Sequence, residues 1–262
     1  MIGALLVLAS ISSAQITDTT FRLPRDGTVT IEGVFNRIRI ESGGDQVVVS
    51  GARARLSGRE LLITGAQVGA RHETADVVRI RIPAWARLDA SIFEGSLDVT
   101  GPLESLQAEV ASGSVNVQGG AGTISLEVMN GPVTIRDFTG TRLEIEALND
   151  HVVVDGATGT VDLEVVNGGV AMRNIRSSSV TVESVNGNLV WRGAVERNGN
   201  YWFSTHNGNI QMLLPASTNA TVSAESVMGN ITSNLTAIGR SEWGQGRPRE
   251  VNFVIGAGGA GI

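Results

Sequence analysis

From residue 88 to residue 232, apolar and polar side chains alternate on both sides of a turn that recurs every 18 to 21 residues. Apolar residues two apart before and after each turn predict two short β-strands per repeat, each with one buried face, and helical spacing fits none of them. A period of this length is typical of a solenoid, in which one repeat cannot bury its apolar face without its neighbours. The eight turns are centred on Gly95, Gly113, Gly131, Asp150, Gly168, Gly187, Gly208 and Gly229.

Four positions of the repeat are apolar in nearly every copy, namely the seventh and fifth residues before the turn and the second and fourth after it. In the third repeat these residues are Ile124, Leu126, Val133 and Ile135. Stacking the repeats about 4.8 Å apart would turn each position into an apolar ladder that lines the interior. Burial of each Val, Leu or Ile contributes roughly 1.5 to 3 kcal/mol. We therefore predict an all-β chain that forms a single parallel β-solenoid, a β-helix-like rod with irregular N-terminal coils.

An asparagine precedes the turn centre in most of the later repeats. Glycine adopts left-handed backbone angles without steric cost and asparagine tolerates them, which predicts a structural turn rather than a ligand contact at this corner. Asparagines stacked at one position also bond to one another or to neighbouring backbone in repetitive sheets, so we expect an asparagine ladder. The predicted ladder consists of Asn130, Asn149, Asn167 and Asn186, and Asn207 is a further turn residue at the same corner.

The chain begins with an apolar run over residues 2–11 that small residues close at 12–14. This pattern predicts a signal peptide over residues 1–14 and export to the periplasm, the cell surface or the medium. No basic residue precedes the run, so an ordinary buried strand is the alternative. The run is too short to span a bilayer, and no other stretch is long and apolar enough, so we expect no integral membrane segment.

Residues 15–87 are less regular than the repeats that follow. Glycines separate predicted strands at 28–31, 37–40, 47–49, 60–63 and 77–82. We interpret these strands as the first coils and the cap of the same rod, because a solenoid end must be covered to prevent edge pairing. A separate small β domain is the alternative. Residues 88–262 are then the regular solenoid, and its last coil is incomplete or ends as an open edge.

The amino-acid composition limits the kinds of site and partner that this chain can have. The chain has no cysteine, which excludes disulfides and thiolate metal sites, and every basic residue other than histidine is arginine. Its net charge is −6, and the excess of acids lies entirely beyond residue 100. An acidic repeat region repels phosphate backbones, so we expect no nucleic-acid partner. No residue pattern indicates a cofactor.

Glutamate recurs four residues before the turn, on the outer face that the alternation predicts. Like charges about 4.8 Å apart repel, so something should compensate them. Arginines five residues after their turns, at Arg136, Arg173 and Arg192, are one source of compensation, and hydration is another. A divalent cation, most plausibly Ca²⁺, is the functional alternative, because carboxylates are the hard oxygen ligands it prefers. The glutamates are Glu109, Glu127, Glu146, Glu164 and Glu183.

The stretch at residues 82–99, with the sequence IPAWARLDASIFEGSLDV, resembles a hallmark of the bacterial putative-adhesin β-solenoid family, a domain of otherwise unknown function. Members of that family combine irregular N-terminal strands, a proline-containing strand end and repeated strand units that turn at Ser-Gly or Asn-Gly-Asp. The resemblance covers nearly everything from about residue 28 onward. It implies a β-solenoid with no agreed catalytic residues, so no site residue is transferred.

The sequence thus favours a non-enzymatic exported rod that serves as an adhesin-like or envelope scaffold surface, binding an envelope polysaccharide or a surface protein. A polysaccharide-active β-helix enzyme is the first alternative, since four Asp residues are available as carboxylates and the later repeats gather aromatic residues. A self-assembling polymer, associating end to end, is the second. The residues that the enzyme alternative requires are Asp137, Asp150, Asp155 and Asp162, or the neighbourhood of Trp191, Tyr201, Trp202 and His206.

Overall fold

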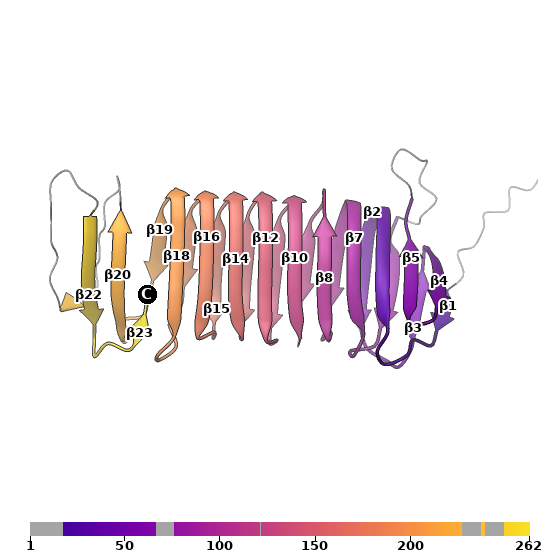
Figure 1. The fold of residues 1–262 in the computed structure, drawn as a ribbon, viewed down its shortest axis with the longest axis horizontal. Coiled ribbons are helices and arrows are strands. Elements are labelled where there is room, and N and C mark those ends of the chain that lie inside the picture. Colours follow the sequence, from indigo (N-terminus) through magenta and orange to yellow (C-terminus); the bar gives the residue numbers. More distant parts are fainter. Residues whose placement is uncertain (1–17, 67–75, 121, 227–236, 239–248) are drawn as a thin grey trace, which may run out of the picture.

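The computed structural model describes residues 18–66, 76–120, 122–226, 237–238 and 249–262. Within these residues every regular element is a β-strand, and the 23 strands belong to one hydrogen-bonded system. Most strands stack side by side along an elongated body (Figure 1). The predicted all-β, parallel solenoid is therefore confirmed. The proposed signal peptide at 1–14 and the turn at Gly229 lie outside the described residues.

Each regular coil contributes one strand to each of two parallel ladders. The first ladder consists of the N-terminal part of β7 (Arg87–Thr100), β8 (Ser105–Val110), β10 (Thr123–Asn130), β12 (Arg142–Asn149), β14 (Thr160–Asn167), β16 (Ser179–Asn186) and β18 (Asn200–Asn207). The second consists of the C-terminal part of β7, β9 (Val115–Gln118), β11 (Val133–Phe138), β13 (Val152–Ala157), β15 (Val170–Ile175), β17 (Leu189–Arg192) and β19 (Ile210–Leu213).

The four predicted apolar positions line the interior of the regular coils. In the third repeat Ile124, Leu126, Val133 and Ile135 are buried, and each pairs in register with the equivalent residue of the next coil. A further inward position, three residues before the turn, was not among those predicted. It holds Ile92, Val110, Val128, Ala147, Val165 and Ser184, all buried.

Each coil has a second corner, six residues after the first turn, that the repeat pattern did not predict. The backbone there has a positive φ in six consecutive coils, which explains why small or amide-bearing residues occupy it. Glycine fills it four times, and the two exceptions are Asp137 and Asn174, with φ of 54° and 56°. The residues at this corner are Gly101, Gly119, Asp137, Gly156, Asn174 and Gly193.

The N-terminal strands continue the stack but add antiparallel pairs. Strand β2 (Thr28–Ser42) pairs in parallel with β7 on one side and with β5 (Glu60–Thr64) and β6 (Val78–Ile82) on the other. The antiparallel pairs join β1 (Thr19–Phe21) to β3 (Val47–Ser50), β3 to β6, and β4 (Arg53–Ser57) to β5. The predicted strands at 28–31 and 37–40 are both parts of β2, and those at 47–49, 60–63 and 77–82 correspond to β3, β5 and β6, whereas β1 and β4 were missed. The alternating arginines of β2 and β6 are exposed, as predicted.

The C-terminal coils depart from the repeat. Strand β20 (Ala220–Ser226) pairs antiparallel with β22 (Arg249–Ile255), which also pairs with β21 (Ala237–Ile238). The short β23 (Ala260–Gly261) pairs in parallel with both β18 and β20, so the end of the chain lies between them (Figure 1). The pattern predicted that Val222 and Ala224 would stack on Tyr201 and Phe203. They do not, because β23 occupies that place.

Candidate functional site

The glutamates at the fourth position before the turn form a continuous line on the first ladder. Each pairs in register with the next, and serine residues, Ser91 and Ser204, occupy the same position at the two ends. Every glutamate of the line is exposed, as the alternation predicted. We call this line the acidic column, and it consists of Glu109, Glu127, Glu146, Glu164 and Glu183.

The arginines expected to neutralise the acidic column do not do so. They belong to the second ladder, on the other side of the coil, and Arg173 binds Asp155 of that same ladder at 2.9 Å. Asn174 also donates to Asp155, at 2.7 Å, and together Asn174 and Arg173 hold the pKa of the Asp155 carboxyl below its usual value. Among the ion pairs of the described residues, none includes a member of the acidic column, which leaves hydration as its compensation.

A line of carboxylates, one per coil, differs from a preformed metal cage. Over the described part of the chain, no three His, Asp or Glu side chains gather closely enough to hold a metal ion. A Ca²⁺ ion on the acidic column would lie between two neighbouring glutamates and draw its remaining oxygen ligands, of about six to eight, from water or a partner. Ca²⁺ binding by these five residues stays a prediction.

The asparagine ladder is confirmed. The amide nitrogen of each asparagine donates to the side-chain oxygen of the asparagine one coil before, at 2.9 to 3.1 Å, and Asn130 donates to the Ala111 carbonyl at 3.2 Å. The asparagines are not in the left-handed region, however. A positive φ is found instead at the turn centre of four coils, with values of 139° to 143° at Gly95, Gly113, Gly131 and Asp150, and an asparagine precedes only the last two of these. The asparagines therefore hold the coils in register rather than form the turn.

We predict that Asn167→Ala lowers the free energy of unfolding by about 1 to 2 kcal/mol, because it removes both the bond to Asn149 and the bond from Asn186. Chemical denaturation followed by circular dichroism measures the loss. Asn209→Ala is the matched control, because the Asn209 side chain makes a single neutral bond, to the Asn188 side chain at 3.2 Å, and should lose about half as much. Equal stability of Asn167→Ala and the parent would contradict a stabilising ladder.

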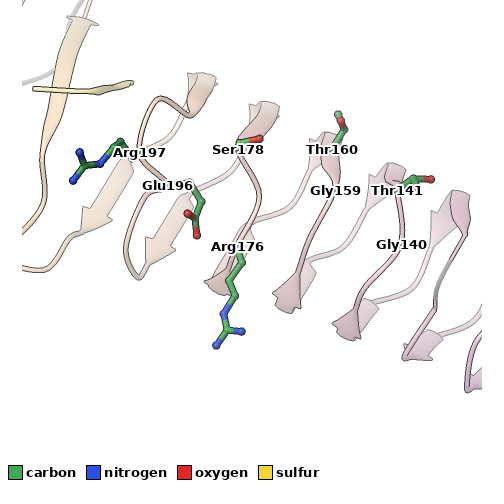
Figure 2. A pocket seen from close by; sticks show the side chains of 8 residues that line it. All are labelled: Gly140, Thr141, Gly159, Thr160, Arg176, Ser178, Glu196 and Arg197. Carbon is green, nitrogen blue, oxygen red and sulfur yellow. The ribbon is translucent and has the colours of Figure 1, made fainter.

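A depression lies where the chain passes from the second ladder back to the first, at the opposite end of the strands from the asparagine ladder (Figure 2). Its volume is about 560 Å³. The side chains of Arg176 and Arg197 point in different directions, with Glu196 between them (Figure 2). The two guanidinium groups thus do not converge on a common ligand. The lining residues are Gly140, Thr141, Gly159, Thr160, Arg176, Ser178, Glu196 and Arg197.

The aromatic residues that the polysaccharide-active enzyme would require lie partly in the interior and partly on the surface. Trp191 and Tyr201 are buried against each other with ring centroids 5.4 Å apart, whereas Trp202 is 58% exposed. The Tyr201 hydroxyl donates to the Ser177 carbonyl at 2.8 Å and accepts from the Glu196 amide, and burial raises its pKa. His206 is exposed. These side chains do not line a common cavity.

The four aspartates that the polysaccharide-active enzyme would require do not form one cluster. Asp155 belongs to the second ladder and Asp162 to the first, where it binds Arg142 at 2.8 Å. Asp150 is at the first turn and Asp137 at the second corner. Asp137 lies opposite Gly156 in the adjacent coil and is therefore close to Asp155, whereas Asp150 and Asp162 lie on other parts of the coil.

One surface feature was missed by the sequence analysis. The residue two before the turn is large, apolar and exposed in five coils, although it belongs to the outer face. The signal was present in the sequence as an apolar residue at an outward position of the alternation. We call this line the apolar stripe, and it consists of Phe93, Met129, Leu148, Val166 and Val185.

These features define a class of protein, a β-solenoid whose outer face repeats one set of side chains in every coil. Residues 37–251 match the profile of the Toastrack family, DUF4097, and the chain belongs to that family. No curated protein matches the chain. No helix within the described ranges has the length and apolarity that a membrane crossing requires.

Two solved structures are similar to this chain at low identity. A putative adhesin from Parabacteroides distasonis is 13% identical, with a TM-score of 0.39, and the match covers 75% of this chain and 96% of that one. A putative cell adhesion protein from Clostridium sporogenes is 9% identical, with a TM-score of 0.37 and coverage of 76% and 99%.

Proposed function

We propose that this chain is an exported, non-enzymatic rod that binds an envelope polysaccharide or a surface protein through its repeated outer face. The observation that supports this function is the acidic column, which presents the same exposed carboxylate in consecutive coils. Contacts that are individually weak add up when many equivalent ones act together. Such a face suits adhesion or scaffolding, where a partner is as extended as the rod.

The equivalence of the coils gives the test. Glu127→Gln, Glu146→Gln and Glu164→Gln should each reduce retention of the full chain on envelope fractions of the source organism by a similar factor of about two to five, because each removes one of several equal contacts. The triple variant should lose most of the retention. Co-sedimentation measures the bound fraction, and repeating it with a chelator shows whether Ca²⁺ bridges the column to an anionic polymer.

Glu41→Gln is the matched control, because Glu41 is an exposed carboxylate of β2, outside the acidic column. It should leave retention unchanged. An active site behaves differently, since one or two carboxylates carry the reaction and a single substitution abolishes it. If one of the three glutamates accounted for the whole effect, or if none had an effect, the repeated-contact function would be rejected.

Two assays separate the alternatives. Shortening of uronate polymers by the chain would favour the polysaccharide-active enzyme. Light scattering that rises with protein concentration would favour end-to-end assembly into a polymer. Cell fractionation of the full chain tests export, since deletion of residues 2–14 should then retain the protein in the cytosol.

A further inference from the structure

The apolar stripe runs beside the acidic column on the same face. Its side chains are 60, 46, 40, 37 and 44% exposed, in chain order from Phe93 to Val185, and Ala111 fills the same position in the one intervening coil. Apolar side chains scattered singly over a surface need no explanation, but a contiguous line of them marks an interaction site. Six consecutive coils contribute to this line.

The spacing of the two lines follows from strand geometry. In the four coils that contain both, the stripe residue and the glutamate are two residues apart on one strand, so they point the same way and lie about 6.6 Å apart. Successive coils are about 4.8 Å apart, which makes the stripe about 24 Å long. The surface is therefore a narrow apolar track with a row of carboxylates along one side.

Within the described strands of the first ladder, no arginine is free to neutralise the row of carboxylates. Along the described strands of the first ladder, Arg87 and Arg142 are the arginines on the outer face. Arg87 binds Glu104 at 3.1 Å, and Arg142 binds Asp162 at 2.8 Å. Both lie at the far end of their strands from the stripe. A macromolecular partner that binds the acidic column would therefore supply its own cationic side chains.

We propose that the apolar stripe and the acidic column together dock a cationic amphipathic helix of a partner protein, lying along the rod. The proposal rests on the proposed function, since it names the partner class for the same face. A helix repeats every 5.4 Å, close to the coil spacing of about 4.8 Å, whereas same-face residues of an extended strand are about 6.6 Å apart and lose register within two coils. About 16 helical residues cover the stripe, at 1.5 Å each.

The width of a helix also fits. A helix about 10 Å across, with its apolar side on the stripe, places flanking Lys or Arg side chains above the acidic column. A second copy of this chain fits less well, because its own first ladder brings carboxylates and no free cation. An anionic lipid surface is repelled by the same carboxylates.

The test uses an 18-residue peptide with leucines at helical positions i, i+3, i+4 and i+7 and lysines on both flanks. Isothermal calorimetry with the full chain should show one peptide per rod, with an affinity that falls as salt rises. The triple variant Met129→Gln, Leu148→Gln, Val166→Thr and the triple variant Glu127→Gln, Glu146→Gln, Glu164→Gln should each weaken binding by about tenfold or more. The exposed positions leave folding intact, which circular dichroism verifies.

Two matched controls distinguish docking at this surface from nonspecific charge attraction. Asp98→Asn, Asp137→Asn, Asp155→Asn removes the same charge from the second ladder and its corner, and it should bind the peptide as the parent does. A peptide of the same composition in scrambled order should bind at least about tenfold more weakly, because it has no apolar side. Equal binding of both peptides, or equal loss in the second-ladder variant, would overturn the docking site. So would unchanged affinity in the stripe variant.

The outcome is distinguishable from that of the proposed function. If the parent chain and the stripe variant sediment equally with envelopes, the repeated-contact function is supported and the proposed helix-docking surface is rejected. If the chain binds the peptide at the stripe but does not bind the envelope, the docking surface is supported and the envelope function is rejected. Self-association abolished by the stripe variant would replace the helix with a second copy as occupant.

Discussion

Gly113→Ala should destabilise the rod by about 2 to 5 kcal/mol, from a strained backbone and an overlap with the neighbouring coil. Gly113 has a φ of 141°, which L side chains rarely adopt, and a Cβ at this position would overlap the carbonyl oxygen of Gly95 one coil before. The obstacle is backbone, so no side chain can move to relieve it. Because a domain is stable by only about 5 to 15 kcal/mol, the loss is a large share of the total.

Gly193→Ala separates the effect of backbone strain from the effect of overlap with the neighbouring coil. Gly193 has nearly the same φ, 143°, but a Cβ there would meet only the Asn174 nitrogen, at an ordinary 3.7 Å. It should lose only the strain, about 1 to 3 kcal/mol. Chemical denaturation followed by circular dichroism measures both variants, with the first transition analysed because repeat proteins unfold in parts. Equal losses in the two variants would show that the close approach of the coils does not restrict this position.

Trp191→Ala should cost about 3 to 5 kcal/mol, as expected when a large aromatic side chain is removed from a packed core. Trp191 is 2% exposed, and its ring meets Tyr201 and Phe203 edge to face at 5.4 and 5.6 Å. Its indole nitrogen donates to the Gly193 carbonyl at 3.1 Å. The substitution removes these contacts and leaves a cavity between β17 and β18, so the C-terminal coils should unfold at lower denaturant concentration than the parent.

Trp202→Ala is the control for Trp191→Ala, since it deletes the same side chain from the neighbouring coil at a position that is 58% exposed. Its stability should stay within about 0.5 kcal/mol of the parent. A larger effect at Trp202 than at Trp191 would contradict the placement of these two rings.

The periodic part of the chain is where sequence reasoning succeeded. Ladders in the interior, exposed glutamates and the asparagine ladder all follow from one repeated alternation, because equivalent residues of a solenoid stack in register. The aromatic coil follows the same alternation, because Tyr201 and Phe203 occupy the predicted inward positions and Trp202, between them, points outward and is 58% exposed. The second corner was missed because Asp137 and Asn174 interrupt its column of glycines.

The candidate site was only partly predictable, because the sequence did not show which arginines and carboxylates form ion pairs. The alternation places Arg173 and the acidic column on outer faces, but each coil has one outer face on the first ladder and another on the second. Only the structure shows that Arg173 lies on the second ladder with Asp155. The apolar stripe was likewise visible as Met129 or Leu148 in the sequence, yet its exposure depends on how the strand approaches the turn.

The repeat pattern was enough to establish that this chain is a stack of two-strand coils. When an apolar strand face recurs at a constant period, each copy is buried by stacking on the equivalent faces of the neighbouring repeats. Only the tertiary structure showed which charged side chains pair and that the last strand inserts between β18 and β20. Those outcomes depend on distances between residues of different coils and on how the ends of the stack are closed. Neither is encoded in the period, which only describes what the coils have in common.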